Sequence, residues 1–514
     1  MTNNDGSSSA AGRPDERAAD SPDSVGLQKG AVGLGGDFVG AISCVAPTLS
    51  VGLTLAAFVM AVGVAGPSSV LITGVAMLCV ATGYSRLNRV EPNAAAGVPW
   101  LRRIMPALGF VMGLLVVITI LFILISNVSL TGTTVLSLFD TNLVNNALAV
   151  WAVGATCVLG AVVVAVFGVQ VQIRFQTVIV VLEYAVVIFC ACAILWAHAN
   201  GHLSAAPHPS LSWLSPTSAT GAGGGIAAGI VLAVFTLGGW ENPIYLAEEQ
   251  RNSTKDPGRA AYLGIIWGAI FLAFLIFAFQ SAAPADELQK QGGNVLAYAT
   301  GLVLPSPWPM LINLALISSL AAGVQATASD GARTAYGMAR ERIFPAVFGR
   351  VNPRYRTPSA AFVIIGLAVV VVSVLYAASG SVVTILANVT STAGYLFTII
   401  YVSVALTSIW LFRSHVISSP GRFVSGALVP LAGCAVLMYA FIKSLTTAPA
   451  GVVLPTVLVP TFAVVLGLVL QRFSPVPFFR QKVTPYAEAA EPESQESAVT
   501  SVRDVTPTLA PEQI

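Results

Sequence analysis

Charged residues are scarce in this sequence. Only 9% of the 514 residues are Asp, Glu, Lys or Arg and 55% are hydrophobic, whereas soluble domains carry about 25% charged residues. A soluble fold of this length would therefore expose large apolar patches. The net charge of +2, without a basic run interleaved with aromatics, also argues against nucleic acid as a partner. Lipid suits this composition, and we predict a membrane protein.

Metal-binding and redox patterns are missing too. The six cysteines all lie in apolar stretches and form no CxxC motif, so we expect them to behave as small hydrophobes. Three of the four histidines, His198, His202 and His208, share one long loop that has no carboxylate or thiol. We therefore expect no disulfide framework, no metal site and no cofactor other than a coupling ion.

Both ends of the chain lack long hydrophobic runs. Residues 1–34 are rich in Ser, Asp, Gly and Ala and lack the apolar core of a signal peptide. Residues 474–514 are similarly polar. Such compositions are typical of disordered segments, and we predict a cytoplasmic tail at each end.

Long hydrophobic runs fill the rest of the chain. A membrane-spanning helix needs about 20 mostly apolar residues. Stretches of this kind lie near residues 37–63, 67–87, 106–130, 147–168, 174–197, 224–247, 259–281, 309–332, 358–378, 382–412, 425–445 and 451–471. We predict an all-α polytopic membrane protein with 12 transmembrane helices: helices one to five in 35–197, an outer loop in 198–223, helices six to ten in 224–412, and the last two in 413–473.

The basic residues support this arrangement. Cytoplasmic loops of membrane proteins carry most of the Lys and Arg. With both tails inside, every Lys and Arg except Lys290 and Lys443 falls in a predicted inner segment. We expect a multi-pass protein of the plasma membrane with both termini cytoplasmic; its oligomeric state is open.

Two of the predicted helices are interrupted half-way. The first contains Ala46-Pro47-Thr48-Leu49-Ser50, and the sixth contains Phe235-Thr236-Leu237-Gly238-Gly239-Trp240-Glu241-Asn242-Pro243. A mid-span proline removes a backbone hydrogen bond, and lipid cannot satisfy the freed groups. A carboxylate such as Glu241 is costly at membrane depth and is usually functional. Because these helices each begin a five-helix unit, the breaks predict an inverted repeat with a binding site between them; the alternative is two merely kinked helices.

Other polar residues inside the predicted spans have two interpretations each. Glu183 in helix five either holds a proton or cation, which we favour, or hydrogen-bonds to a neighbouring helix. Asn127 in helix three and Gln325 in helix eight either contact a solute or join helices. Asp330 and Arg333, three residues apart in helix eight, are predicted to pair with each other or with the inner loops.

Three stretches carry a family resemblance. They are FTLGGWENPIYLAEEQRNSTKDPGRA from Phe235, ARTAYGMARERIFPAVFGRVNPRYRTP from Ala332, and the first span around Pro47 with the segments that follow it. Together they resemble the amino acid permeases of the amino acid–polyamine–organocation superfamily, over about residues 35–470.

The resemblance implies a five-plus-five inverted-repeat (LeuT-like) fold of 12 helices. It implies a central site between helices one and six, flanked by three, eight and ten. Phe235 matches the position of an aromatic gate, and Glu241 that of a carboxylate linked to gating and proton coupling. Glu183 falls near a place where some relatives carry a lysine whose ammonium replaces sodium.

The sequence departs from the family at the first break. Many relatives have Gly-x-Gly there, where bare backbone amides hold the substrate carboxylate, but this chain has Pro47-Thr48-Leu49. The departure leaves room for an amine without a carboxylate. Two further changes, Asn252-Ser253 in place of Asn-Pro and Gly258 in place of a proline, lie in a predicted cytoplasmic loop.

These observations predict a secondary transporter for an amino acid or a related small amine, working by alternating access. The first break's carbonyls and Glu241 would receive the ammonium, with Phe235 and Trp240 as apolar cover. The candidate substrate-binding residues are Ala46, Pro47, Thr48, Leu49, Ser50, Asn127, Phe235, Thr236, Gly238, Gly239, Trp240, Glu241 and Gln325. The candidate coupling residues are Glu183, Glu241, Ser318 and Ser319. We expect a proton rather than sodium, because burial disfavours a charged carboxylate.

Other classes of protein fit less well. A membrane-embedded enzyme would need clustered histidines or carboxylates or a nucleophile motif, and the spans contain no GxSxG. A channel would have rings of polar residues along one path. Three alternatives stay open: a polyamine or choline-like organocation carrier, an amino acid exchanger, and a transporter-like membrane sensor.

Overall fold

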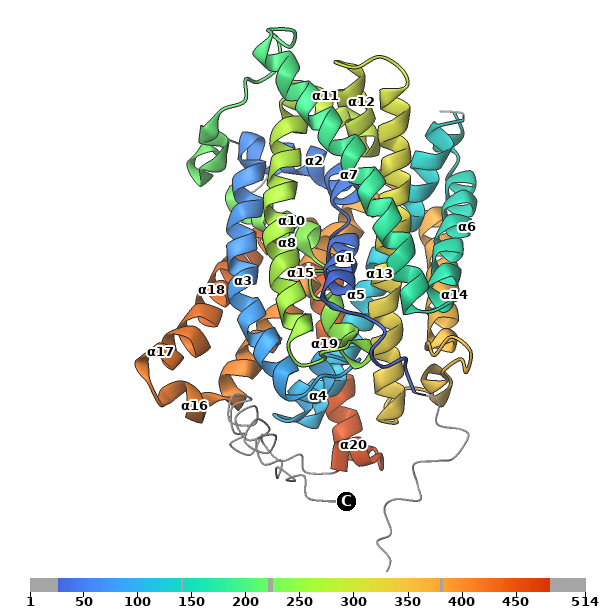
Figure 1. Cartoon of the computed structure of the whole chain (residues 1–514), viewed down its shortest axis with the longest axis vertical. Coiled ribbons are helices and arrows are strands. Elements are labelled where there is room, and N and C mark those ends of the chain that lie inside the picture. Colours follow the sequence, from blue (N-terminus) through green and yellow to red (C-terminus); the bar gives the residue numbers. More distant parts are fainter. Residues whose placement is uncertain (1–25, 140–141, 221–224, 380–381, 481–514) are drawn as a thin grey trace, which may run out of the picture.

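The computed structural model describes residues 26–139, 142–220, 225–379 and 382–480. Over these ranges the chain is helical apart from loops and one isolated bridge, between Val32 and Gln250. The helices run roughly along the long axis, with α11 and α12 at one end of the molecule and α4 and α20 at the other (Figure 1).

The helices are defined as follows. They are α1 (Leu34–Val45), α2 (Pro47–Val62), α3 (Gly66–Val90), α4 (Gly97–Arg102), α5 (Pro106–Ser137), α6 (Ala147–Val166), α7 (Val169–Ala199), α8 (Gly225–Leu237), α9 (Asn242–Tyr245), α10 (Asp256–Gln280), α11 (Ala285–Gln291), α12 (Val295–Gly301), α13 (Trp308–Arg340), α14 (Ser359–Ser379), α15 (Val382–Leu411), α16 (Arg413–Ile417), α17 (Pro420–Phe423), α18 (Val429–Leu445), α19 (Ala450–Phe473) and α20 (Pro477–Arg480).

Many of these helices are suited to a bilayer. Within the described ranges, nine helical stretches are long and apolar enough to cross a membrane; the first, Leu34–Val90, takes in α1 to α3. Two shorter apolar helices, Gly225–Leu237 and Ser359–Leu375, add to them. The protein is therefore an all-helical, multi-pass membrane protein.

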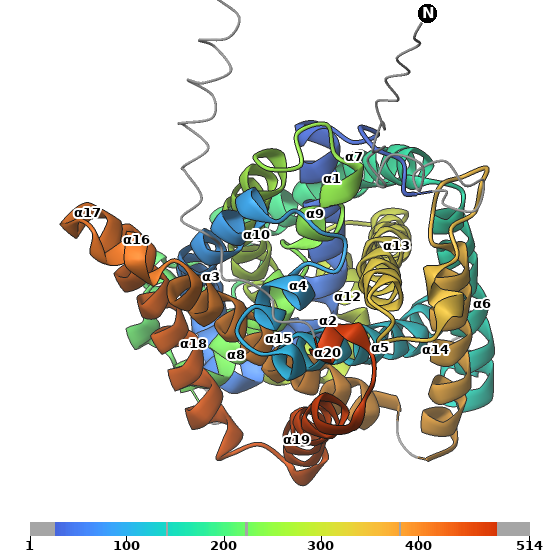
Figure 2. The ribbon, with the colours of Figure 1, turned by 90° about the horizontal axis from the view of Figure 1, so that it is seen from below.

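The helices divide into central and peripheral ones. Of the most apolar part of α5, 67% is buried inside the protein, against 22% for α19. Seen from below, α1, α5, α13 and α15 lie towards the middle, whereas α6 with α14 and α16 to α18 lie on opposite sides (Figure 2). The central helices contact one another, α5 with both α13 and α15, and α1 with α13. The pocket described below lies among these central helices.

Small residues let the central helix α5 and its outer neighbour α6 approach closely. A Cβ on Gly132 of α5 would lie 1.9 Å from the carbonyl oxygen of Val150 in α6, and one on Gly154 would lie 1.9 Å from that of Val128. Backbone contact of this kind replaces the hydrophobic effect as a driving force for packing in lipid. It fixes α5, which forms one wall of the pocket described below.

The segments next to the two ends pack against the bundle. The backbone of Val32 pairs with the loop after α9, through Val32 N–H to Glu249 O (3.2 Å) and Arg251 N–H to Val32 O (2.8 Å). Phe478 of α20 is buried and lies under the guanidinium of Arg102, 4.4 Å from its ring centre. Residues 26–33 and 474–480, assigned to tails from sequence, thus have defined places; the rest of the predicted tails, 1–25 and 481–514, lies outside the described residues, as do 221–223 of the predicted outer loop.

Candidate functional site

The first helix break lies between α1 and α2. Ala46 has a left-handed backbone conformation (φ 44°), and Pro47 begins α2 directly after it. Because proline has no N–H, the carbonyl of Ser43 loses its helical partner. The Val45 carbonyl is instead bonded by the hydroxyl of Ser50 (2.7 Å). The break is therefore real and only partly repaired by its own side chains.

Two other helices supply acceptors for the start of α2. The Thr48 N–H donates to Oε1 of Glu183 in α7 (3.3 Å), and the Leu49 N–H donates to Oγ of Ser319 in α13 (3.3 Å). Glu183 and Ser319 are buried, at 2% and 0% exposed. A carboxylate at a helix N-terminus is also favoured by the helix dipole. Glu183 thus caps the second half of the first broken helix.

The second break lies between α8 and α9. Gly239 has φ +101°, a conformation that side-chain-bearing residues rarely adopt, and a Cβ on it would lie 2.6 Å from Sγ of Cys44 in α1. Glycine is therefore required here both by the turn and by the approach of α1. The Gly239 N–H donates to Oε2 of Glu241 (3.1 Å), so this break is capped by its own carboxylate.

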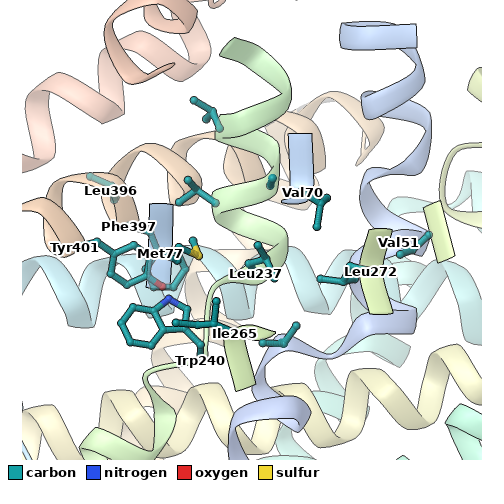
Figure 3. Packing of buried hydrophobic residues seen from close by; sticks show 14 of the residues in the cluster. Val51, Val70, Met77, Leu237, Trp240, Ile265, Leu272, Leu396, Phe397 and Tyr401 are labelled. Atoms are coloured by element: carbon teal, nitrogen blue, oxygen red, sulfur yellow. The ribbon is translucent and has the colours of Figure 1, made fainter. Parts of the chain in front are cut away.

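The carboxylate of Glu241 is held by a tyrosine of another helix. The hydroxyl of Tyr401 in α15 donates to its Oε2 (2.9 Å). The ring of Trp240 lies against Tyr401 and Tyr84, with centroids 5.3 and 5.1 Å away. Figure 3 shows Trp240 beside Tyr401 and Phe397 within the hydrophobic cluster. Trp240 thus supports the break from behind instead of covering the solute site.

A pocket lies between the two breaks. Its cavity volume is about 40 Å³, which is room for a few water molecules. A solute of amino acid size would enter only when the surrounding helices move. Its walls are formed by Cys44, Val45, Leu49, Ser50, Leu53, Val116, Ile120, Ile123, Asn127, Phe235, Gly238, Gly239, Glu241, Tyr245, Gly323, Thr327, Asp330, Phe397 and Ile400.

The polar part of the pocket is acidic. Oδ1 of Asp330 accepts from the Asn242 amide (2.5 Å), and its Oδ2 is 3.7 Å from Sγ of Cys44. Arg333, one turn along α13, does not pair with Asp330: its Nε donates to Glu249 (2.5 Å), and it also bonds Ser329. Arg333 thus pairs with the inner loop, one of the two predicted partners, and leaves Asp330 facing the pocket.

The predicted substrate residues separate into two groups. Leu49, Ser50, Asn127, Phe235, Gly238, Gly239 and Glu241 line the pocket. Ala46, Pro47, Thr48, Thr236, Trp240 and Gln325 do not line it. The Thr236 hydroxyl donates to the carbonyl of Leu232 in its own helix. Gln325 is fully buried away from the pocket, and its side chain has no hydrogen bond among the described residues.

The predicted coupling residues also separate. Glu183 and Ser319 meet at the start of α2, next to the pocket. The Ser318 hydroxyl donates to the carbonyl of Ala315 in its own helix (2.8 Å) and does not join them. Glu241 lines the pocket itself.

Several pocket residues escaped the sequence analysis. Cys44, Thr327 and Asp330 face one another, with Cys44 Sγ 3.7 Å from Thr327 Oγ1. Tyr245 and Phe397 complete the wall. Asp330 had been singled out only for a pairing role, although its position in an apolar span could have indicated a place in the pocket. The others looked like ordinary apolar or weakly polar residues, because nothing in the sequence shows which side of a helix faces inward.

Comparison with known proteins identifies the family. The family model for amino acid permeases matches residues 36–484, which is most of the chain. Curated relatives match more narrowly. The glutamate/serine transporter AimA of Bacillus subtilis is 26% identical over 140 residues, 25% of each chain. The human Asc-type amino acid transporter 1 is 23% identical over 152 residues, 30% of this chain and 28% of that one. The matched region thus spans only about a quarter of these relatives.

Solved structures show the same fold. The transporter MhsT, solved in complex with L-phenylalanine, superposes with a TM-score of 0.58 at 16% identity, covering 82% of this chain and all of that one. A manganese transporter from Eremococcus coleocola gives 0.55 at 14%, covering 88% and 95%. These are LeuT-like folds, as the resemblance implied. Family and fold are those of transporters and not of enzymes, and the chain belongs to the amino acid permease family.

Proposed function

We propose that the protein is a secondary active transporter that moves a small amine-bearing solute, an amino acid or a relative of one, by alternating access. The observation that carries this is the pocket shared by two broken helices, with Glu241 in its wall. Interrupted helices that meet at membrane depth are the usual binding device of secondary transporters. Membership of the amino acid permease family supports the solute class.

The arrangement of the chain follows from counting each broken pair as one span. With α1/α2 and α8/α9 as spans one and six, α19 becomes span twelve. We propose that spans one to five (35–197) and six to ten (224–412) form the two inverted repeats. We place the protein in the plasma membrane with both termini in the cytoplasm. The distribution of Lys and Arg supports this orientation.

Movement of the helices follows from the size of the pocket. A cavity of about 40 Å³ holds no amino acid. The α1 half contacts Gly239 of the second break so closely that the two halves move together or separate. In our proposal the two halves separate, so that opening releases the contact between Cys44 and Gly239 and closing restores it around the solute.

We propose that the driving ion is a proton carried by Glu183, with Glu241 as the second candidate. Glu183 joins α7 to the start of α2 and has one partner on the moving helix, so its protonation would change that contact. A sodium site would require several oxygen ligands in one place. Of the two serines proposed for sodium, only Ser319 shares the start of α2 with Glu183, whereas the hydrogen bond of Ser318 stays within its own helix.

Uptake into proteoliposomes tests this function. Labelled amino acids and amines are offered with the pH gradient and the sodium gradient varied separately, and protein-free liposomes serve as the control. We expect accumulation that follows the pH gradient and is unaffected by sodium. Loss of uptake on sodium removal at fixed pH would contradict proton coupling, and exchange without accumulation would indicate an exchanger. No flux of any solute would contradict transport itself.

A further inference from the structure

We propose that the pocket selects a primary amine that carries no carboxylate and has an apolar body. This inference rests on the proposed transport function and narrows its solute. The ammonium would lie at Glu241 and Asp330, and the body against the apolar wall formed by Phe235, Phe397 and Ile120.

The first argument is that the first three residues of α2 offer no free backbone donor to a carboxylate. Pro47 has no N–H. The N–H of Thr48 is taken by Glu183, that of Leu49 by Ser319, and that of Ser50 by the carbonyl of Ala46 (2.8 Å). A solute carboxylate would have to displace a buried protein carboxylate to reach these amides. Such a helix start usually attracts anions; here the protein supplies the anion.

At the second break, three backbone N–H groups are also bonded by the protein itself. The Gly238 N–H donates to the carbonyl of Phe235 (3.1 Å), and the Gly239 N–H donates to Glu241. The Asn242 N–H donates to the carbonyl of Gly239 (3.0 Å). These three amides are therefore already taken by the protein, as are the first amides of α2.

The third argument is that the pocket lining contains two carboxyl groups and no basic side chain, and that the nearby Arg333 pairs with Glu249. Glu241 and Asp330, at 2% and 4% exposed, both line it, and no Lys, Arg or His is among its lining residues. Both hydrogen bonds that Glu241 accepts from other residues end on Oε2, and its side chain lines the pocket. Buried charges need a partner of opposite sign. An ammonium supplies it, whereas a carboxylate would add repulsion.

Two further groups are available for the same ligand. The side chain of Asn127, at 2% exposed, lines the pocket and hydrogen-bonds to no other described residue. Among the described residues, no backbone N–H donates to the carbonyl of Cys44, since the Thr48 N–H that would reach it in a continuous helix is turned to Glu183. Both oxygens can accept from an ammonium, which carries three N–H donors.

The rest of the wall indicates the apolar body. Apart from the acidic group and Asn127, the lining is dominated by aliphatic and aromatic side chains from α2, α5, α8 and α15. No second carboxylate pair stands at the opposite end to receive another ammonium. A monoamine with an aliphatic or aromatic body therefore fits better than a diamine.

Matched pairs of compounds test the inference directly. The purified protein is titrated with leucine and isopentylamine, phenylalanine and phenethylamine, and lysine and cadaverine, with thermal shift as the readout. Each pair differs in one carboxylate. We expect each amine to half-saturate the shift at a concentration at least about tenfold below that of its amino acid, given the repulsion between buried like charges. The two monoamines should bind more tightly than cadaverine.

A pair of variants isolates the cap. Glu183→Ala removes the acceptor and frees the Thr48 N–H, so amino acids should gain on amines and the tenfold preference should shrink. Glu183→Gln keeps an oxygen for Thr48 and should preserve the preference. An unchanged preference in Glu183→Ala would overturn the role of the cap.

The outcomes separate this inference from the proposed function. Amino acids that bind as tightly as their amines, or more tightly, and that are taken up into proteoliposomes would overturn the amine inference and leave transport intact. Absence of both binding and uptake for all six compounds would count against the transport function as well.

Discussion

The two helix breaks satisfy their backbones in different ways. The first is capped from a distance: Glu183 on α7 and Ser319 on α13 accept the first N–H groups of α2. The second is capped locally, because Glu241 folds back on Gly239 two residues earlier. The first cap joins three helices, whereas the second is made within one chain segment, is held by Tyr401 of α15 and faces the pocket.

This difference assigns different work to the two glutamates. A change at Glu183 alters how α7 and α13 hold α2, so it affects the movement of a helix. A change at Glu241 alters the wall of the pocket, so it affects what is bound. The comparison therefore predicts that the two residues fail in distinguishable ways.

The largest effect is expected at Glu241. In Glu241→Gln the pocket loses one of its two carboxylates, and solute binding and uptake should both fall by about a hundredfold, on the scale of losing a charged partner in a buried site. Binding by thermal shift and uptake in proteoliposomes would be measured together. Normal binding with lost uptake would show instead that Glu241 acts only in coupling.

A smaller and more selective effect is expected at Glu183. Glu183→Gln retains an acceptor for Thr48 but not a carboxylate that can take up and release a proton. Accumulation against a gradient should fall by about tenfold, while exchange of labelled for unlabelled solute stays within about twofold, as expected when coupling and binding are separate free energies. Equal loss of accumulation and exchange would mean that Glu183 is structural.

The hydroxyl that steadies Glu241 should contribute less. Tyr401→Phe removes one hydrogen bond to a buried carboxylate, and solute affinity should fall by about tenfold, or about 1.4 kcal/mol. Tyr395→Phe is the matched control, since Tyr395 lies on the same helix and donates to Ser444 (2.7 Å), away from the pocket. Equal losses of solute affinity in the two variants would show that Tyr401 has no specific role at the site.

The smallest effect is expected at Trp240. Because its ring packs against Tyr84 and Tyr401 and does not line the pocket, Trp240→Phe should keep solute affinity within about twofold. Phe235→Ala, in contrast, should lower affinity by about tenfold, since aromatic side chains contribute most to such contacts. A larger loss of affinity in Trp240→Phe than in Phe235→Ala would indicate that Trp240 contacts the solute after all.

The general fold could be predicted from the sequence because membrane helices depend on local composition. Pro47, which has no N–H, and Gly238-Gly239, which can adopt unusual backbone angles, indicate the two breaks directly in the sequence. Glu241 stood out because a carboxylate in an apolar span is rare. For Asn127, composition left two interpretations open, and only the structure shows that it lines the pocket.

Other parts of the site depend on tertiary structure and could not be predicted. Trp240 was expected to face the solute, but the turn at Gly239 directs it towards Tyr84 and Tyr401. The sequence left open whether Asp330 and Arg333 pair with each other or with the inner loops, and the fold pairs Arg333 with Glu249 of an inner loop. Hydrogen bonds between residues 135 positions apart, such as Thr48 and Glu183, depend on how helices cross.

The most direct test of the account is an experimental structure of the protein with its transported solute bound. The account predicts the solute between the two breaks, with its nitrogen within hydrogen-bonding distance of Glu241 and the Thr48 N–H still bonded to Glu183. A solute bound elsewhere, or an anionic group of the solute on the Thr48 and Leu49 amides, would contradict it.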